Sequence, residues 1–373
     1  MQFDPSAISP HPARLPYAAL IKMRRLLRTL YRLAQRPAYH ELLCDLLPET
    51  ARFDPGHDAV MMGYDFHLDA DDTPQLIEVN TNAGGSIYAY KAAFPEADPD
   101  LPLPGHFPMR FLASFREDFR RFAAGSGLEL GLMVILDEQP LEQNLYPEMY
   151  FLRNFFRSRG LPTEICDPAE LQADATGVFL KGRRVAMLYN RHCDFYLEQA
   201  ELAGIRAAYL NRSVCLSPNP RAYGLLADKQ RLALWSDAQF LRDAGVSSRG
   251  RELIRELVPH SELFAGQDPD QVWSRRNGLV FKPLTLFGGK GVLMGKSMSR
   301  KRFNELDPHN TLLQRLVKPS LSAGGAEGEM KTDFRLFVYR NRLLGVSARL
   351  FQGQLTNLRT PGGGFARVEI TRE

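Results

Sequence analysis

Cysteine is scarce in this sequence, and long hydrophobic runs are missing from it. The four cysteines are Cys44, Cys166, Cys193 and Cys215, and none of them forms a CxxC pair or a zinc-ligand pattern. This wide spacing favours reduced, scattered thiols, as in reducing compartments. No apolar stretch approaches the ~20 residues that a membrane helix needs, and the N-terminal segment has no basic region followed by an apolar one. We therefore expect a cytoplasmic protein without a membrane partner.

The sequence also lacks a large excess of either positive or negative charge. The chain has 47 lysines and arginines against 43 aspartates and glutamates, which gives a formal net charge of +4. This balance does not require a nucleic acid partner, although it is compatible with an anionic ligand. A basic run between residues 22 and 36 has helical spacing and is typical of a solvated helix face. With 44% hydrophobic residues, the chain of 373 residues is expected to bury its core in about two or three packed units.

Several common signatures of catalysis and nucleotide binding are also absent. The sequence contains no GxGxxG fingerprint, no P-loop, and no Ser-His-Asp or Cys-His signature of a nucleophilic enzyme. His192 and Cys193 are adjacent, but a strand end that faces a substrate cleft explains them more simply. Ligands bind beyond the carboxyl ends of parallel strands, so Arg191 is a candidate substrate contact.

Hydrophobic periodicity divides the first part of the chain into distinct segments. Residues 17–47 have the spacing of a long amphipathic helix that is broken near Pro37. Residues 59–69 and 76–80 are strand-like and are joined by an acidic turn, which predicts a hairpin. A proline-rich stretch at 98–108 is typical of a linker.

Beyond this stretch, helical and strand-like segments alternate to about residue 220. The expected helices are 111–124 and 148–159, and the expected strands are 131–138, 163–166 and 185–189. The alternation predicts a small Rossmann-like α/β unit with a parallel sheet. A further unit is expected from residue 228, with a helix to 244, a flexible loop at 321–329, and strands at 279–282, 292–294, 311–317, 334–339 and 344–351.

Lysines and glycines near residue 285 are candidates for phosphate binding. Lys282 ends an apolar strand, and a short loop with Gly288, Gly289, Lys290 and Gly291 follows. Glycines let backbone N–H groups approach phosphate oxygens closely, and a lysine supplies a point charge. A tight hairpin turn is the alternative explanation of this loop.

Oxygen-bearing side chains on the predicted hairpin are candidates for metal binding. Glu78 and Asn80 alternate along one strand, so both side chains point to the same face, and Asp65 lies on the preceding strand. Hard oxygen ligands of this kind suit Mg²⁺, which takes few protein ligands and binds nucleotide phosphates. An exposed polar face of the hairpin is the alternative.

Cationic and amide side chains gather near the end of the sequence. Arg335, Arg349, Asn357 and Arg359 lie on two predicted strands and the loop after them. Arginine is suited to bidentate binding of carboxylate or phosphate. Single arginines are common on surfaces, so each of these residues is informative only together with the others.

These motifs together resemble the ATP-grasp ligases, in particular the ribosomal-protein glutamate ligases and the bacterial glutathione synthetases. A "D-x-R-x-F-V" strand is matched by Asp333, Arg335, Phe337 and Val338, and the arginine that ends the next strand is matched by Arg349. The "N-L-x-x-G-G" loop of those families is approximated by Asn357, Leu358, Gly363 and Gly364.

The order of the matching parts differs from those families. Their next elements, a helix, "G-V-D" and "E-V-N-x-x-P-G", correspond here to segments near the start of the sequence, at 17–47, 63–65 and 78–84. Eukaryotic-type glutathione synthetases have a similar order, so the resemblance implies a circular permutation, which is physically cheap when termini lie close together. The loop after Asn80 lacks the usual proline, which predicts an unusual acceptor side.

The resemblance implies an α/β chain with α+β elements, namely a circularly permuted ATP-grasp fold with a Rossmann-like α/β domain. It assigns metal-binding strands to residues 1–108, a substrate domain to 109–225, the lid to 226–313 and the rest of the catalytic domain to 314–373.

The resemblance also implies roles for individual residues, with ATP and Mg²⁺ (or Mn²⁺) as cofactors. The ATP phosphates would be bound by Lys229, Lys282, Gly288, Gly289, Lys290 and Gly291. The adenine would lie against the backbone of Gln314, Arg315, Leu316 and Val317. The metal ligands would be Asp65, Glu78 and Asn80, the catalytic residues Arg335, Arg349 and Asn357, and the substrate contacts Asn82, Arg191, Arg359 and Gly363.

The implied reaction joins a small-molecule carboxylate, such as an amino acid or peptide, to an amine through an acyl phosphate, in an enzyme that can be a homo-oligomer. A phosphotransferase on the same scaffold and an inactive nucleotide-binding regulator are the alternatives. The permutation predicts that Asp65, Glu78 and Asn80 converge with Lys282 and Arg349 around one cleft.

Overall fold

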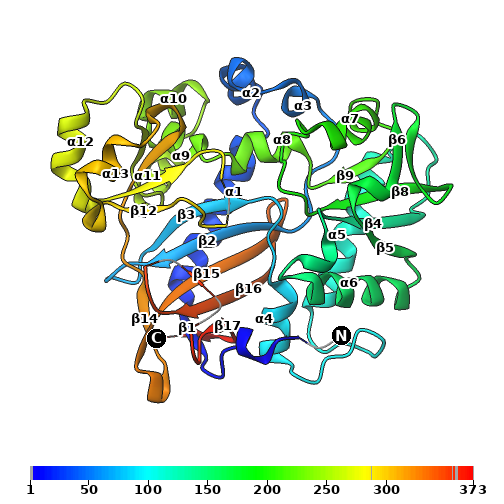
Figure 1. Ribbon diagram of the computed structural model, residues 1–373, viewed down its shortest axis with the longest axis horizontal. Coiled ribbons are helices and arrows are strands. Elements are labelled where there is room, and N and C mark those ends of the chain that lie inside the picture. Colours follow the sequence, from blue (N-terminus) through cyan, green and yellow to red (C-terminus); the bar gives the residue numbers. More distant parts are fainter. Residues whose placement is uncertain (1–2, 287, 355, 358–359, 373) are drawn as a thin grey trace.

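Three groups of strands lie side by side in the computed structural model, which describes residues 3–286, 288–354, 356–357 and 360–372. An antiparallel central sheet is flanked on one side by an α/β unit and on the other by a smaller unit with its own sheet (Figure 1). Among the helices in these described segments, none is both long and apolar enough to cross a lipid bilayer.

The central sheet combines strands from the two ends of the sequence. Its order is β17-β16-β15-β2-β3, and β14 pairs with the N-terminal part of β15. The predicted hairpin is confirmed, because β2 and β3 pair antiparallel with Asp65 opposite Glu78. β15 pairs with the other edge of β2 and places Arg335 opposite Asp65. The strand bounds are β2 (Met62–Leu68), β3 (Pro74–Asn80), β14 (Ser320–Ala323), β15 (Glu329–Tyr339), β16 (Arg342–Phe351) and β17 (Gly364–Ala366).

Helix α1 (Tyr17–Leu33) covers the face of this sheet that is turned away from the viewer in Figure 1. Its buried side chains, among them Met23, Leu27 and Leu30, share one hydrophobic core with Tyr64 and Leu336 of the sheet. The predicted break near Pro37 is confirmed, since α1 ends at Leu33 and α2 begins at Pro37. The remaining elements of this part are α2 (Pro37–Leu43), α3 (Glu49–Arg52), α4 (Ser86–Ala93), and the parallel pair β1 (Ala13–Pro16) and β18 (Val368–Thr371).

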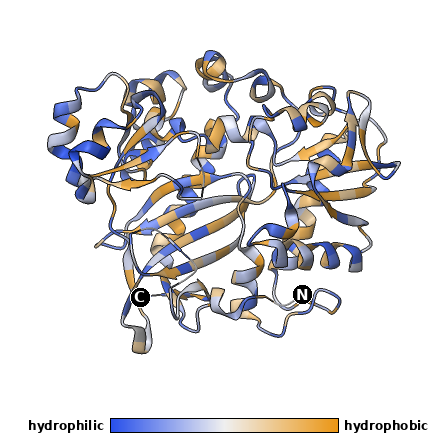
Figure 2. Cartoon of the chain, viewed as in Figure 1, coloured by the Kyte–Doolittle hydropathy of each residue, from blue (hydrophilic) through white to orange (hydrophobic). Residues whose placement is uncertain are grey.

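The predicted alternation of helices and strands produces the α/β unit. Strands β5, β4, β8 and β9 run parallel in that order, and the hairpin of β6 and β7 extends β8. All five residues of β4 are buried, as expected for a parallel strand that is covered on both faces. The strands of the α/β unit are largely hydrophobic in Figure 2. The bounds are β4 (Leu132–Leu136), β5 (Thr163–Cys166), β6 (Leu171–Asp174), β7 (Gly177–Leu180), β8 (Arg183–Asn190), β9 (Cys215–Ser217), α5 (Phe107–Phe122), α6 (Tyr146–Ser158), α7 (Ala203–Leu210) and α8 (Pro220–Ala222).

The smaller unit has an antiparallel sheet of order β10-β13-β11-β12 and a core of its own around Phe281, Phe303 and Leu313. The single helix expected to reach residue 244 is wrong. The helix is interrupted at Asp237, whose carboxylate accepts hydrogen bonds from two N–H groups of the next helix and so caps it. The bounds are α9 (Gln230–Ser236), α10 (Ala238–Asp243), α11 (Ser248–Leu257), α12 (Pro269–Arg275), α13 (Arg300–Asn304), β10 (Ser261–Leu263), β11 (Leu279–Pro283), β12 (Leu293–Met294) and β13 (Thr311–Arg315).

A second expectation that fails is the flexible loop at 321–329. Instead, β14 pairs with the start of β15, with Ser320 opposite Thr332 and Ala323 opposite Glu329. The small and polar composition that suggested a loop belongs to an exposed two-stranded extension of the sheet.

Candidate functional site

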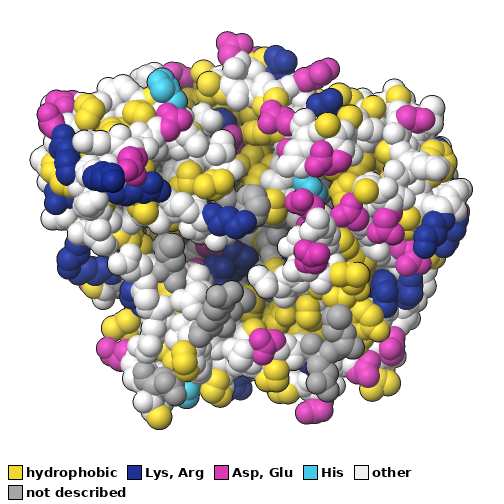
Figure 3. Space-filling model, in the orientation of Figure 1, with side chains coloured by type: hydrophobic (Ala, Val, Ile, Leu, Met, Phe, Trp, Pro, Cys, Tyr) yellow, Lys and Arg dark blue, Asp and Glu magenta, His cyan; other side chains and the backbone are white. Residues whose placement is uncertain are grey.

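A cavity of about 1000 Å³ lies where the three groups of strands meet. Its walls come from β2, β3, β15 and β16 of the central sheet, from β11 and β13 of the smaller unit, and from the segments after β4 and β8 of the α/β unit. Figure 3 shows a hollow near the middle of this face with Lys or Arg side chains inside it.

Most of the residues predicted from the sequence line this one cavity. Those on its wall are Asp65, Glu78, Asn80, Asn82, Arg191, Lys282, Gly288, Gly289, Lys290, Gln314, Arg315, Leu316, Val317, Arg335 and Arg349. Lys229, Gly291, Asn357 and Gly363 are not part of the described lining, and Arg359 lies outside the described residues. The structure therefore brings the two ends of the sequence together with its middle at one place.

Asp65 is bound on both of its oxygens by arginines. Arg335 donates from Nε to Oδ1 at 2.6 Å and from Nη2 to Oδ2 at 2.5 Å, and Arg349 donates to Oδ2 at 3.1 Å. Burial raises the pKa of Asp65, but the two guanidinium groups outweigh burial and lower it to about 2. Asp65 is therefore ionised at neutral pH and is held by both arginines.

Asp333 is a cavity residue that the sequence did not single out as part of the site. Its Oδ2 accepts from Arg349 at 2.6 Å and from Thr356 at 3.1 Å, whereas its buried Oδ1 has no hydrogen-bond partner among the described residues. The signal in the sequence was its position two residues before Arg335, because alternate residues of a strand share a face.

Glu78 and Asn80 present oxygen atoms beside this cluster. Asn80 donates from Nδ2 to Oε1 of Glu78 at 3.1 Å, and its amide oxygen, which has no donor among the described residues, is suited to a cation. The pairing of β2 and β3 slips at this point, so that Ile77 is an extra residue in β3. Its carbonyl accepts from Lys282 at 3.0 Å, which ties the smaller unit to the central sheet.

The donor set therefore fits a hard divalent cation such as Mg²⁺. Carboxylate and amide oxygens are its preferred protein ligands, and the buried, unpartnered Oδ1 of Asp333 adds a further oxygen on the same wall. Lysines of the smaller unit lie opposite and supply positive charge for anionic groups.

Lys282 is the most enclosed of these lysines. Burial lowers its pKa to about 8, and Lys229 acts in the same direction, while Glu78, Asp65 and Asp333 raise it. Burial also lowers the pKa of Lys229, whose Nζ donates to the carbonyl of Leu286 at the start of the glycine-rich loop. Gly288 and Gly289 adopt φ angles of 62° and 74° with no other group near their Cα hydrogens, so the loop backbone is open to a ligand.

The predicted adenine-binding segment forms the rear of the cavity. Gln314 is buried and donates to the carbonyl of Ile77 at 3.4 Å, and the N–H of Leu316 donates to the carbonyl of Gly278 at 2.7 Å. A ring nitrogen of His67 lies 3.2 Å from the carbonyl of Val317. β13 thus contacts both the smaller unit and the central sheet, as a hinge between them would.

The α/β unit contributes the predicted substrate side. Arg191 is buried and forms an ion pair with Glu148 at 3.5 Å, and its Nε has no hydrogen-bond partner within the described segments. Asn82 donates to the carbonyl of Arg191 at 3.1 Å and so holds the loop after β3 against the end of β8. Burial raises the pKa of the neighbouring Asp137 to about 6, although Arg191 opposes this change.

Two predicted residues bond within their own loop instead of facing the cavity. Asn357 donates to the carbonyl of Gln352 at 2.9 Å and accepts from Thr360 at 3.1 Å. The N–H of Gly363 donates to the carbonyl of Thr360 at 2.9 Å, and a side chain at this position would collide with the carbonyl of Leu350. Their contacts organise the loop that carries Thr356 to Asp333.

Another cluster of titratable groups, His57, Asp118 and Cys215, lies away from the cavity. His57 Nδ1 is 3.0 Å from Asp118, and its Nε2 is 4.0 Å from the Cys215 sulfur, which is the order of a nucleophilic triad. All three side chains are buried, and none lines the cavity. Because Ser217, Tyr339 and the N–H of Asp58 also donate to Asp118, this cluster is a closed structural network.

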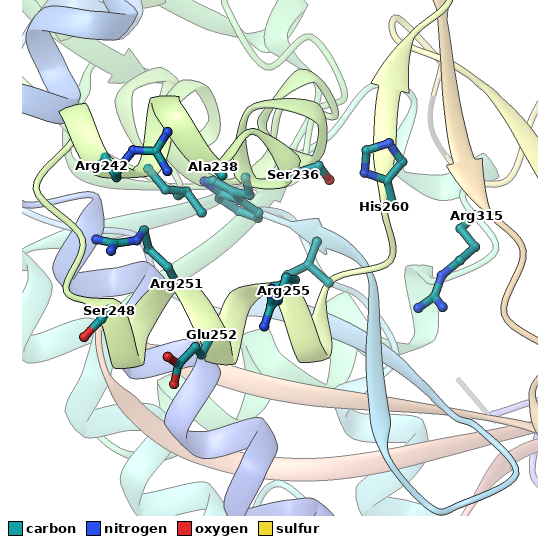
Figure 4. A pocket seen from close by; sticks show the side chains of 12 residues that line it. Ser236, Ala238, Arg242, Ser248, Arg251, Glu252, Arg255, His260 and Arg315 are labelled. Atoms are coloured by element: carbon teal, nitrogen blue, oxygen red, sulfur yellow. The ribbon is translucent and has the colours of Figure 1, made fainter.

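A second cavity, of about 480 Å³, lies on the outer side of the smaller unit. Figure 4 shows Arg242, Arg251, Arg255, His260 and Arg315 around it. Arg251 is bonded to the carbonyl of Val246 and Arg242 to the side chain of Gln239, so part of this positive charge serves local structure. Only Arg315 belongs to both cavities among the described residues.

No protein-family model matches the chain, and no curated protein sequence is similar enough to count as a relative. Solved structures do resemble it. A glutathione synthetase-like effector from Globodera pallida superposes with a TM-score of 0.60 at 12% identity, over 98% of this chain and 90% of that chain. A protein described as a γ-glutamylcysteine synthetase from Methylobacillus flagellatus superposes with a TM-score of 0.52 at 12% identity, over 92% and 85%. The ATP-grasp ligase PsnB, solved with Mg and ADP, gives a TM-score of 0.33 at 14% identity, over 66% and 90%. The chain has an α/β fold of the ATP-grasp, glutathione synthetase-like type.

Proposed function

We propose that this protein is an ATP-dependent carboxylate–amine ligase that works through an acyl phosphate and releases ADP and phosphate. The observation that carries the proposal is the convergence of Lys282, Glu78 and Arg349 on one cavity, in a chain with a glutathione synthetase-like fold. A nucleotide needs cations for its phosphates, oxygen ligands for its metal and a flat apolar wall for its base. The lysines and Gln314 line this cavity from the smaller unit, and Glu78 and Asn80 line it from the central sheet.

The phosphates would lie between the two main walls. Lys282, Lys290 and the backbone of Gly288 and Gly289 would bind them from the smaller unit, with Lys229 supporting the loop through Leu286. The base would lie against the end of β13 and the two residues after it, from Gln314 to Val317. A bound Mg²⁺, held by Glu78 and Asn80, would neutralise charge on the β- and γ-phosphates.

Arg335 and Arg349 would act on the reacting groups. A substrate carboxylate oxygen would attack the γ-phosphorus, and the bond from phosphorus to the β–γ bridging oxygen would break, with its electron pair leaving on ADP. The guanidinium groups would stabilise the transferring phosphoryl group by charge and position. The nitrogen of an amine would then attack the acyl carbon, form the amide and release phosphate and a proton.

Arg191 and Asn82 are the proposed contacts for an amino acid or peptide substrate on the α/β side. Arg191 is suited to this role because its buried Nε has no partner in the described chain. Closure of the glycine-rich loop over the cavity would keep water away from the acyl phosphate.

We further propose that the chain is a circular permutation of the usual ATP-grasp order. The pairing of β2 with β15, whose contacting residues are 270 positions apart, supports it. Under this proposal, residues 1–108 and 314–373 form one catalytic domain, 226–313 its lid and 109–225 the substrate domain. A cytoplasmic location and a homo-oligomeric state complete the proposal.

The test uses purified protein with Mg-ATP, a panel of amino acids and small peptides, and hydroxylamine. Hydroxylamine converts acyl phosphates to hydroxamates, so hydroxamate formation that depends on one carboxylate would establish the activation step. ADP release with a stable phosphoester and no hydroxamate would replace the ligase by a phosphotransferase. ATP binding without turnover on any substrate would favour a regulator.

A further inference from the structure

The second cavity, on the outer side of the smaller unit, combines an apolar floor with a basic rim. Trp235, Leu241 and Val258 line this outer cavity with side chains that are buried in the fold. Its volume of about 480 Å³ lies within the range of small-molecule sites. A ligand that fills it would therefore carry an apolar part, such as an aromatic ring, against the indole of Trp235.

The basic rim comes from helices α10 and α11 and from strand β13. Arg242 lies on α10, Arg251 and Arg255 lie on α11, and Arg315 ends β13. In Figure 4, Arg242 and Arg251 stand at one end of the outer cavity, and His260 and Arg315 stand at the other. Separate elements of the smaller unit thus bring cationic side chains to one small volume.

This positive charge is not compensated by the residues that the structure describes. None of the four arginines forms an ion pair with a described residue, and Glu252 is the one acidic residue of the described lining. Arg251 and Arg255 are four positions apart on α11, a spacing at which like charges repel each other. Arg255 forms no hydrogen bond with its side chain to any described residue. A bound anion would relieve this repulsion, and guanidinium groups are suited to phosphate.

We propose that the outer cavity binds a small organic phosphate, whose phosphate is held by Arg255, His260 and Arg315 and whose organic part lies against Trp235. A phosphate dianion suits this site better than a single carboxylate does, because the described lining has four guanidinium groups against one carboxylate. This site is separate from the proposed nucleotide site and goes beyond the proposed ligase activity.

Arg315 connects the outer cavity with the cavity of about 1000 Å³, the main cavity, because it is the one described residue that lines both. Its Nη2 donates to Oε1 of Gln75 at 3.0 Å, and Gln75 donates to the carbonyl of Glu256 in the last turn of α11 at 3.0 Å. Gln75 lies near the start of β3, two residues before Ile77, whose carbonyl accepts from Lys282. The side chain of Arg315 thus fastens the end of β13 to the central sheet.

The shared arginine gives a phosphate in the outer cavity an effect on the main cavity. A bound dianion would neutralise the charge of Arg315 and compete with Gln75 for its N–H groups. Both changes lower the positive potential beside the proposed nucleotide site and loosen β13, so ADP should bind more weakly. Because coupling between two binding sites is reciprocal, ADP should weaken phosphate binding by the same factor. This coupling rests on the proposed function, whereas the phosphate site itself does not.

Phenyl phosphate, which joins an aromatic ring to a phosphate, is the probe for the outer cavity. Isothermal titration calorimetry gives its dissociation constant for the intact chain and for each variant. We expect a constant of about 0.1 mM for the intact chain. Benzoate has the ring but only a single carboxylate, and it should bind at least about fivefold more weakly.

Arg255→Gln should weaken the binding of phenyl phosphate at least about tenfold, because it removes a guanidinium group that has no other described partner. Arg249→Gln is the matched control. Arg249 is exposed on the same helix but outside the described lining, so the constant should stay within about twofold. Lys282→Met changes the main cavity alone and should also retain binding.

Three outcomes would overturn the phosphate site. Loss of binding in Lys282→Met together with its retention in Arg255→Gln would place the phosphate in the main cavity. Equal affinity for benzoate would contradict the preference for a dianion. The absence of binding at about 10 mM phenyl phosphate would exclude the site altogether.

The coupling is measured with Mg-ADP. Phenyl phosphate should raise the dissociation constant of ADP about fivefold and then reach a plateau. In Arg255→Gln the same rise should need at least about tenfold more phenyl phosphate. Competition within the main cavity would raise the constant without a plateau and would overturn the coupling, as would an unchanged constant. A chain that binds phenyl phosphate as expected but binds no ADP would contradict the proposed ligase and leave the outer site established.

Discussion

Two clusters of buried charge in this protein differ in how completely they are satisfied. Around Asp118, both carboxylate oxygens accept hydrogen bonds, from His57 and Ser217 on one side and from Tyr339 and the N–H of Asp58 on the other. Around Asp65 and Asp333, by contrast, Oδ1 of Asp333 and Nε of Arg349 have no hydrogen-bond partner in the part of the chain that the structure describes.

The difference indicates what each cluster is for. A closed network gains stability and specificity of packing, because every buried polar group has its bond. Buried polar atoms without hydrogen-bond partners lower the stability of the free protein. Beside a cavity they are tolerated only where a bound ligand supplies the missing bonds. The first cluster joins α5, β9 and β15 and holds the α/β unit on the central sheet. The second faces the cavity that we propose to bind nucleotide.

We expect the largest effect on activity from a substitution in the cavity. Lys282→Met removes the enclosed ammonium group, and we expect ATP-dependent hydroxamate formation to fall at least about 1000-fold, equivalent to about 4 kcal/mol of transition-state stabilisation. The free energy of unfolding should change little or rise, because a buried charge is removed. Lys301→Met on exposed α13 is the control and should leave both quantities unchanged. Turnover within tenfold of the original in Lys282→Met would contradict the phosphate-binding role.

Disrupting the cluster around Asp118 should lower the stability of the fold strongly and change ligand binding little. Asp118→Ala leaves His57, Ser217 and Tyr339 without their shared acceptor, and we expect the free energy of unfolding to fall by about 3–5 kcal/mol. Urea unfolding followed by tryptophan fluorescence measures this change. Mn²⁺ binding with ADP should stay within about threefold under conditions where the variant is folded. A variant as stable as the original would show that the network is not structural.

The closed cluster should also make stability depend on pH. Burial lowers the pKa of His57, but Cys215 and Asp118 outweigh burial, and the pKa lies well above its usual value. Burial raises the pKa of Asp118, but His57, Ser217 and Tyr339 outweigh it and the pKa is lowered. Asp58, Cys215 and Tyr339 are the other titratable groups that face this pair.

The sign follows from these two directions. The His57 contribution is fully present below the unfolded pKa of about 6.5 and is lost as the pH rises through the folded value, and the Asp118 contribution is lost as the pH falls below about 4. We therefore expect stability from this pair to be highest between about pH 4 and 6.5 and to decline above that window by at most about 1.4 kcal/mol per pH unit. Unfolding titrations of the original chain and His57→Gln should differ in this slope. Identical slopes would exclude His57 as its source.

The smallest effect concerns a position outside both clusters. Asp237→Ala removes the cap of α10, and we expect a loss of about 1 kcal/mol in the free energy of unfolding with no change in hydroxamate formation. A loss of activity beyond the loss of folded protein would mean that the break between α9 and α10 belongs to the moving part of the smaller unit.

Much of the fold could be predicted because it depends on local patterns. Alternation of apolar residues identified β2 and β3, the buried run at 132–136 identified a parallel strand, and Pro37 marked the break after α1. The errors came from short-range competition that composition does not resolve. Asp237 caps a new helix inside an apparently continuous one, and glycines near 325 form a hairpin extension where a loop was expected.

The sequence identified the residues that line the candidate site better than it identified the chemical role of each. Glu78, Asn80, Lys282 and Arg349 were identified from residue type and spacing, and they do line one cavity. Asn357 was assigned a catalytic role from a motif; it bonds to Gln352 and Thr360 of its own loop, and the catalytic role stays a prediction. Asp333 was recognised only as part of a strand motif, although its Oδ1 is buried without a hydrogen-bond partner among the described residues.

The sequence by itself determined which segments become helices and strands and which faces carry charge, because these follow from the periods of the backbone and from burial of apolar side chains. Only the tertiary structure decided that Asp65 pairs with an arginine 270 positions away and that Oδ1 of Asp333 has no hydrogen-bond partner among the residues described. Hydrogen bonds and desolvation act between neighbours in space, so the state of a buried carboxylate depends on contacts that no local pattern contains.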